Sequence, residues 1–291
     1  MNIIAYVEVA KPKTVLLLSF VALISGLIAY YEVNPTATGL NNLVLSTLAI
    51  IVGSMGANAI TCYIDRDIDA IMYRTKRRPI PSGRINPPEK ALYYGLALVI
   101  IASLLTIATR ILWSLMWFVF GVLDNVIIYN AILKRRNPIN IIAGAPAGGA
   151  PIMVTWSAVT GNVIDLVPLI MAALVVTWTP VHIWSLALRY EDDYKRAKVP
   201  MLPVVVTEKT AIRCISGTTI SLVVYSTLLG ILLNMPFIYY LLITPINLIM
   251  LFLGLKLLYK PLRTSAWKLF KFTSPYLTLQ FIALIIGVMF K

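Results

Sequence analysis

The chain has 291 residues, of which 59% are hydrophobic and only 13% are charged. Soluble globular domains average roughly 45–50% apolar and about 25% charged residues, so this composition excludes a soluble enzyme and a disordered chain. The net charge of +13 alone would suggest nucleic acid, but in so apolar a chain it indicates basic loops beside anionic lipid. We therefore expect the lipid bilayer, and no nucleic acid, as a partner.

The sequence predicts an all-α, polytopic membrane protein. A helix that crosses the bilayer needs roughly 20 apolar residues. Glycines and prolines between Gly144 and Pro151 interrupt the fifth such segment, so we expect it to be kinked or unwound where it faces a cavity. The nine predicted spans are Thr14–Tyr31, Leu43–Ile64, Ala91–Thr109, Ile111–Leu133, Ile139–Val159, Asp165–Leu188, Thr210–Leu233, Pro236–Leu258 and Phe272–Phe290.

Basic residues predict the orientation of these spans. Of the 25 lysines and arginines, all except Arg110 and Lys291 fall in the N-terminal segment or in loops on the same side. The positive-inside rule then places the N-terminus in the cytoplasm and the C-terminus outside. We expect a multi-pass protein of the cell (plasma) membrane whose active site faces the cytoplasm.

The second span ends in the acidic stretch ANAITCYIDRDIDAIMYRTKRRP. On a helix Asn58, Thr61 or Cys62, Asp65 and Asp69 recur at three- and four-residue steps and share one face, whereas Asp67 points elsewhere. Two carboxylates one turn apart suit Mg²⁺, which binds one or two carboxylates together with phosphate oxygens and water. Arg74 and Arg78 follow, and arginine forks match phosphate oxygens. The stretch therefore predicts a Mg²⁺–diphosphate site, with a salt-bridged helix end as the alternative.

Two later clusters carry further polar groups. The first contains Tyr129, the basic run Lys134–Arg136, Asn140 and the glycine-rich segment NIIAGAPAGGAP. Small residues such as those of the last segment are also typical of close helix packing. In the second, His182 lies inside the sixth span, ahead of the acidic residues from Glu191 to Asp193. An ionisable residue within a span is a functional candidate, although a packed core histidine is the alternative. Asp124, inside the fourth span, is either structural or part of a pocket.

Cysteine and histidine are too scarce for two other kinds of site. Only Cys62 and Cys214 are present, both at the edges of apolar runs, together with a single histidine. A disulfide framework, a cysteine metal site and a multi-histidine metal site are therefore not expected.

The segment TCYIDRDIDAIMYRTKRRP resembles the signature of the heme O synthases (protoheme IX farnesyltransferases), a branch of the UbiA superfamily of intramembrane prenyltransferases. The resemblance continues through Tyr129, the KRR run, Asn140–Pro151 and HIWSLALRYEDDYKRAKVPMLPVV, and covers about Ala57–Val206. It implies a UbiA-like fold of about nine helices around a central cavity. Residues 1–291 would then form a single membrane-embedded prenyltransferase domain.

The resemblance also implies an activity. A member of this branch transfers a farnesyl group from farnesyl diphosphate to the vinyl group of heme B, adds water, and releases heme O and diphosphate in a Mg²⁺-dependent reaction. Heme A synthase or a terminal oxidase assembly are the candidate protein partners. A UbiA-type prenyltransferase that acts on a quinone-ring or lipid acceptor is the main alternative, and a polytopic transporter is another.

Roles for individual residues follow from the same resemblance. At the position four residues before the first Asp, where the superfamily usually has Asn, this chain has Thr61, and Asn58 offers an amide one turn earlier. The expected metal ligands are Asp65, Asp69, Asn58 and Asp193, and the expected catalytic residues are Asp65, Asp69 and His182. Diphosphate would bind Asn58, Arg74, Arg78, Lys134 and Arg135. The acceptor pocket would contain Tyr129, Asn140, His182, Asp193 and Tyr194, with His182 as a heme ligand or a base.

Overall fold

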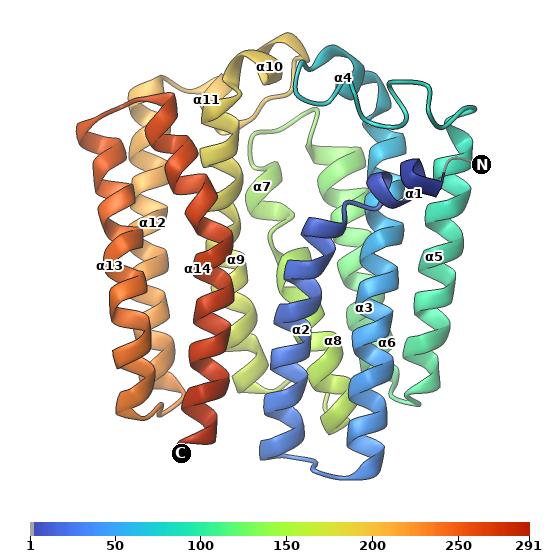
Figure 1. Cartoon of the computed structure of the whole chain (residues 1–291), viewed down its shortest axis with the longest axis vertical. Helices are drawn as coiled ribbons and strands as arrows, with labels where there is room; N and C mark the ends of the chain where they lie inside the picture. The colour runs from blue at the N-terminus through green and yellow to red at the C-terminus, as the bar shows by residue number, and fades with distance from the viewer. Residues whose placement is uncertain (1–2) are drawn as a thin grey trace.

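The structure, a computed structural model, describes residues 3–291 as one bundle of helices (Figure 1). Within these residues, nine helical spans are long and apolar enough to cross a membrane, which confirms the predicted fold class. The spans are α2 (Pro12–Glu32), α3 (Ala37–Ile64), α5 (Glu89–Ala108), α6 (Leu112–Leu123) continued by the π-helix η1 (Asp124–Leu133), α7 (Asn140–Ala143) with α8 (Pro146–Thr160), α9 (Leu166–Arg189), α12 (Glu208–Leu232), α13 (Phe237–Tyr259) and α14 (Arg263–Met289).

Two of the helices begin well before the predicted apolar segments. The second begins at Ala37, where the Thr36 hydroxyl caps it by accepting a hydrogen bond from the Gly39 N–H at 3.1 Å. The ninth begins at Arg263, and Lys268 and Lys271 are exposed on its first turns. Hydropathy measures the part of a helix that crosses the bilayer, and backbone hydrogen bonds continue the helix beyond it.

One end of the bundle carries four short helices that are not part of the spans. These are α1 (Ile3–Val9), α4 (Arg66–Ile71), α10 (Glu191–Arg196) and α11 (Leu202–Val205), and Figure 1 shows them at the end opposite the C-terminus. Because α3 and α9 both end there, the acidic segments that follow them meet across the bundle.

The fifth span is broken, as predicted. The chain turns between Ala143 and Pro146, so that α7 and α8 are separate helices. Gly144 at the break allows a close approach to Tyr129, because a Cβ atom there would lie only 2.7 Å from the Tyr129 Cβ. The close approach brings α7 against η1.

The fourth span changes to a π-helix over its second half, which no sequence pattern predicted. The Lys134 N–H donates to the Tyr129 carbonyl, five residues back, at 2.8 Å. Asp124 begins this segment, is buried, and accepts a hydrogen bond from the Ala147 N–H at 2.8 Å. Asp124 is therefore structural, because its carboxylate binds the positive N-terminal end of α8. π-helical segments are frequent at functional sites, and this one positions Tyr129, Asn130 and Lys134.

Candidate active site

A cavity of about 700 Å³ reaches the end of the bundle that carries the short helices, where residues of α4 and α10 line it. Its walls come from α2, α3, α4, η1, α7, α8, α9, α10 and α14 and from the loop after α4. Every predicted site residue lines it except Arg135, Asn140 and Asp193. The charged and main polar lining residues are Lys11, Lys13, Asn58, Thr61, Asp65, Asp69, Arg74, Arg78, Asn125, Tyr129, Asn130, Lys134, His182 and Tyr194.

Asp65 lies at the junction of α3 and α4, and it is buried. Its Oδ2 accepts hydrogen bonds from the Asn130 amide at 3.2 Å and from the Lys134 ammonium, both on or beside η1. Its Oδ1 is buried without a hydrogen-bond partner among the described residues. A buried carboxylate oxygen without a partner is costly unless a ligand or cation occupies the site.

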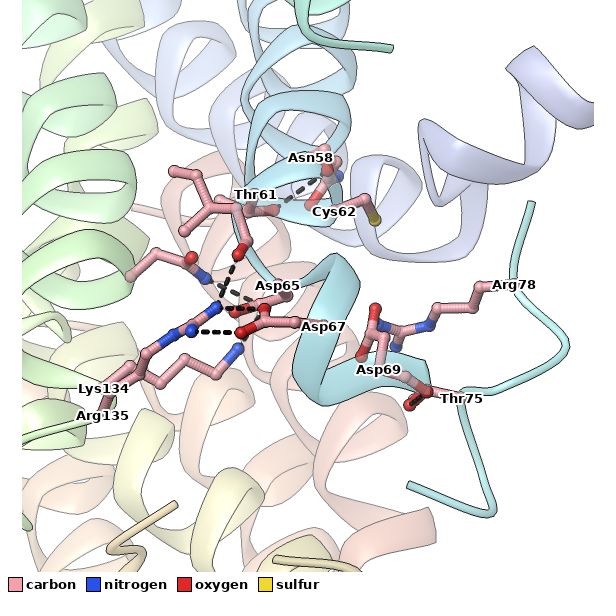
Figure 2. A network of polar contacts seen from close by, with 12 residues as sticks. Asn58, Thr61, Cys62, Asp65, Asp67, Asp69, Thr75, Arg78, Lys134 and Arg135 are labelled. Atoms are coloured by element: carbon pink, nitrogen blue, oxygen red, sulfur yellow. Dashed lines mark hydrogen bonds and ion pairs between the residues drawn. The ribbon is translucent and has the colours of Figure 1, made fainter. Parts of the chain in front are cut away.

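Asp69, one turn further on α4, is also buried and pairs with a second basic side chain. Arg78 donates from Nη1 to Asp69 Oδ2 at 2.7 Å, and Thr75 donates from its hydroxyl to the Asp69 carbonyl at 3.0 Å (Figure 2). These contacts hold the loop after α4 beside the carboxylate. Asp65 and Asp69 thus line the cavity together, each paired with a basic side chain.

The basic partners stay charged despite their burial. Lys134 lies just beyond the end of its span; burial opposes its charge, but the Asp65 carboxylate and the nearby Tyr129 raise its pKa above the usual lysine value. Burial likewise opposes the charge of Arg78, and Asp69 raises its pKa. Among residues 3–291, Arg74, Lys11 and Lys13 have no carboxylate partner within salt-bridge distance. The cavity mouth therefore carries more positive than negative charge and suits a polyanion.

Lys11, Lys13 and Asn130 also line the cavity, although no sequence pattern marked them as site residues. The Asn58 amide donates to the Ala10 carbonyl at 3.1 Å and so fixes the corner where α2 begins. That corner places the two lysines in the cavity wall. In the sequence the two lysines are simply basic residues before the first span, and the positive-inside rule already accounts for basic residues there.

Asp67 and Arg135 pair with each other outside the cavity. The Arg135 guanidinium donates to both Asp67 oxygens at 2.6 Å, and the Asp67 side chain is more than half exposed (Figure 2). The pairing lowers the pKa of Asp67. The prediction that Asp67 points away from Asp65 is confirmed. Arg135, expected in the diphosphate site, does not line the cavity, because its fork pairs with the exposed Asp67.

Asp193 and Asn140 also depart from the prediction. Both carboxylate oxygens of Asp193 accept backbone hydrogen bonds at 3.0 Å, from the N–H groups of Tyr73 and Arg74. Asp193 therefore fastens the loop after α4 to α10, and it does not face the cavity as a metal ligand or acceptor contact. Asn140 is fully buried at the start of α7 and donates to the Asn137 carbonyl at 2.8 Å, so its amide orders the turn before α7.

His182 lines the cavity on α9 and is held on three sides. Its Nδ1 lies 2.6 Å from the Thr273 hydroxyl on α14. The imidazole stacks on Trp178 with ring centroids 4.5 Å apart, and the Phe270 ring lies 4.6 Å away. The histidine is therefore part of an aromatic wall of the cavity.

Mg²⁺ fits the donors on the acidic side. Asp65 and Asp69 each keep an Oδ1 that accepts no hydrogen bond from the described residues, and carboxylate oxygens are the ligands that Mg²⁺ prefers. No group of three or more histidine, cysteine or acidic side chains that could hold a metal occurs within residues 3–291. The two carboxylates would thus share the ion with substrate oxygens and water. Asn58 and Thr61 offer only neutral oxygens one or two turns away along α3.

Known proteins are similar to this chain in both sequence and fold. The model of the UbiA prenyltransferase family matches residues 17–283. A protoheme IX farnesyltransferase of Desulforudis audaxviator is 42% identical over 98% of this chain and 88% of its own length. One of Thermoplasma volcanium is 40% identical over 97% of this chain and 96% of its own.

Solved structures share the fold. A structure described for digeranylgeranylglyceryl phosphate synthase matches with a TM-score of 0.77 and 21% identity, over 99% of both chains. A UbiA homolog from Archaeoglobus fulgidus bound to GPP and Mg²⁺ matches with a TM-score of 0.65 and 15% identity, over 96% of this chain and 99% of the other. The bundle with its acidic and basic cavity is thus the architecture of an intramembrane prenyltransferase. The chain belongs to the UbiA prenyltransferase family.

Proposed function

We propose that this chain transfers the farnesyl group of farnesyl diphosphate to the vinyl group of heme B, with addition of water, to give heme O and diphosphate. One observation carries the proposal: a single cavity joins the paired acids and bases of Asp65, Asp69, Arg78 and Lys134 to the aromatic wall that holds His182. The protoheme IX farnesyltransferases that share 42% and 40% of its sequence support the same assignment.

Asp65 and Asp69 would hold Mg²⁺ through their free oxygens, as one UbiA homolog is described bound to Mg²⁺ and GPP. When bound, the ion supplies positive charge to the diphosphate leaving group. Arg74, Arg78 and Lys134 contribute fixed positive charge from the cavity wall, which stabilises the negative charge that develops as the allylic C1–O bond breaks. The residues therefore act mainly by electrostatics.

The acceptor completes the reaction. A vinyl carbon of heme B forms the new bond to farnesyl C1, water adds to the resulting cation on the neighbouring carbon, and one proton leaves. His182 stands in the aromatic wall where it can bind the iron or accept that proton. The walls of the cavity shield the allylic cation from premature attack by water.

An apolar pocket provides space for the prenyl chain. It has a volume of about 90 Å³ and shares Thr14, Leu18, Asn58, Asn125 and Ala147 with the main cavity. It extends between α2, α3, α6 and α8 toward Trp117 and Phe118. A hydrocarbon tail whose diphosphate lies at Asp65 would enter this pocket and gain from leaving water.

The orientation in the membrane belongs to the same proposal. The N-terminal segment and the basic loops would lie in the cytoplasm, so that the cavity opens there, and the C-terminus would lie outside the cell membrane. The heme product would then pass to a heme A synthase or a terminal oxidase assembly.

Incubation of the purified protein with farnesyl diphosphate, Mg²⁺ and separate acceptors tests the activity. With heme B we expect a product heavier by one farnesyl group and one hydroxyl group, found by chromatography and mass spectrometry. Parallel reactions with a quinone-ring acid and with a glycerol phosphate test the other acceptor classes. Prenylation of one of those acceptors, with heme B unchanged, would overturn the heme assignment and keep the prenyl transfer.

A further inference from the structure

Thr273 on α14 forms a direct hydrogen bond with His182 and is part of a small hydrogen-bond network around it. Thr273 is fully buried. Its hydroxyl lies 2.6 Å from His182 Nδ1 and also 2.6 Å from the Phe270 carbonyl, three residues back on the same helix. The Trp178 indole N–H donates to the Thr273 carbonyl at 2.7 Å. One threonine therefore contacts both the histidine and the indole that stacks on it.

The number of protons available to these hydrogen bonds assigns the tautomer of the His182 imidazole. A carbonyl oxygen only accepts, and a hydroxyl carries one proton, so the Thr273 proton goes to the Phe270 carbonyl. The hydroxyl oxygen must then accept the N–H of His182 Nδ1. In a neutral imidazole the other nitrogen, Nε2, carries the lone pair.

The free nitrogen faces usable space. His182 lines the cavity, and no described residue forms a hydrogen bond with its Nε2. Trp178 and Phe270 lie against the ring, with interplanar angles of 18° and 31°, so rotation of the ring would lose both contacts and the Thr273 hydrogen bond. The ring edge with Nε2 is the part that can meet a ligand.

We propose that Thr273 is a positioning residue that fixes His182 as the Nδ1–H tautomer, with the Nε2 lone pair presented to the cavity. Its consequence for catalysis rests on the proposed function. Both roles open to His182, binding the iron of heme B or accepting the proton of the added water, need an unprotonated Nε2. A partner on the other ring nitrogen sets which nitrogen is free, and loss of such a partner typically costs 10–100-fold.

The tautomer can be measured directly because the chain contains one histidine. Full-length protein labelled with ¹⁵N-histidine in detergent or nanodiscs gives signals from His182 alone. The pattern of two-bond ¹⁵N–¹H couplings distinguishes the two neutral tautomers, without any substrate. We expect a protonated Nδ1 and an unprotonated Nε2. A dominant Nε2–H tautomer in the wild-type protein would overturn the proposal.

Variants of Thr273 test its role. Thr273→Val should lose the tautomer preference and lower heme prenylation by about tenfold or more, with farnesyl diphosphate affinity unchanged. Thr273→Ser, which keeps the hydroxyl, should restore both. Thr219→Val is the matched control, because Thr219 is another fully buried threonine and bonds only to the Ile215 carbonyl.

The two proposals fail in different ways. A Thr273→Val protein that keeps the wild-type tautomer would overturn the role of Thr273, whatever the activity. A wild-type protein that does not prenylate heme B would overturn the proposed function, and the coupling pattern would still decide the tautomer.

Discussion

At the residue scale, three aspartates within five positions have different surroundings. Asp65 and Asp69 are buried in the cavity wall, whereas Asp67 is exposed and paired with Arg135. We expect Asp65→Asn and Asp69→Asn each to lower prenyl transfer at least about a hundredfold, because each removes an anionic Mg²⁺ ligand. Asp67→Asn is the control and should stay near wild type. Turnover that persists in excess EDTA would contradict the metal role.

Lys134 provides a prediction about pH. Its pKa is raised in the folded protein, so the ammonium keeps its proton below the ordinary lysine pKa and loses it only above that value. The Lys134 charge should therefore stay constant between about pH 6 and 9, and its contribution to diphosphate affinity should not change over that range. We expect Lys134→Gln to weaken diphosphate binding about tenfold and Arg135→Gln to leave it unchanged, as measured by calorimetry. Equal losses in both variants would assign the effect to general surface charge.

At the element scale, Asp193 joins α10 to the loop after α4 through the Tyr73 and Arg74 N–H groups. That loop carries Arg74 and Arg78 into the cavity. Asp193→Ala should release the loop, because the Tyr73 and Arg74 N–H groups lose their common acceptor. We expect faster amide hydrogen exchange at Tyr73 and Arg74, together with weaker diphosphate binding.

Asp192→Ala is the matched control for the loop. Asp192 is exposed and pairs with Arg263 on α14, away from the loop, and its pKa is lowered by that hydrogen bond. Exposed ion pairs contribute little, so this variant should exchange like the wild type. Unchanged exchange in Asp193→Ala would contradict the role of Asp193 in holding the loop.

The apolar pocket between α2, α3, α6 and α8 leads to a prediction about chain length. Ser54→Leu fills part of the pocket of about 90 Å³. We expect kcat/KM for farnesyl diphosphate to fall about tenfold relative to geranyl diphosphate, because a shorter tail needs less of this space. Ser221→Leu, on an exposed position of α12, is the control. An unchanged ratio in Ser54→Leu would place the tail elsewhere.

At the scale of the whole molecule, the orientation can be tested with single cysteines. After replacement of Cys62 and Cys214, Asn86→Cys in the loop after α4 should react with an impermeant maleimide only from the cytoplasmic side. Ile164→Cys, exposed in the loop at the opposite end between α8 and α9, should react only from outside. The reverse labelling pattern would show that the orientation is inverted and that the cavity opens on the outer face of the membrane.

The spans and the acidic face of α3 and α4 could be predicted from the sequence alone. Nine apolar segments, the break after Ala143 and the opposite directions of Asp65 and Asp67 are local properties, because hydropathy, glycine and proline positions and helical periodicity act within one segment. All three agree with the structure. The resemblance of the motifs to heme O synthases also led to the family that the comparisons show.

Which polar groups meet depends on how the helices pack. Asp193 and Arg135 carry the charges that a diphosphate or metal site needs, yet backbone N–H groups from a distant loop occupy the first and Asp67 the second. Asn130 faces Asp65 because η1 is a π-helix, and Thr273 reaches His182 because α14 packs beside α9. These pairings join residues 65 to 120 positions apart. A helical pattern in one segment carries no information about the partner on another, because the packing of whole helices selects it.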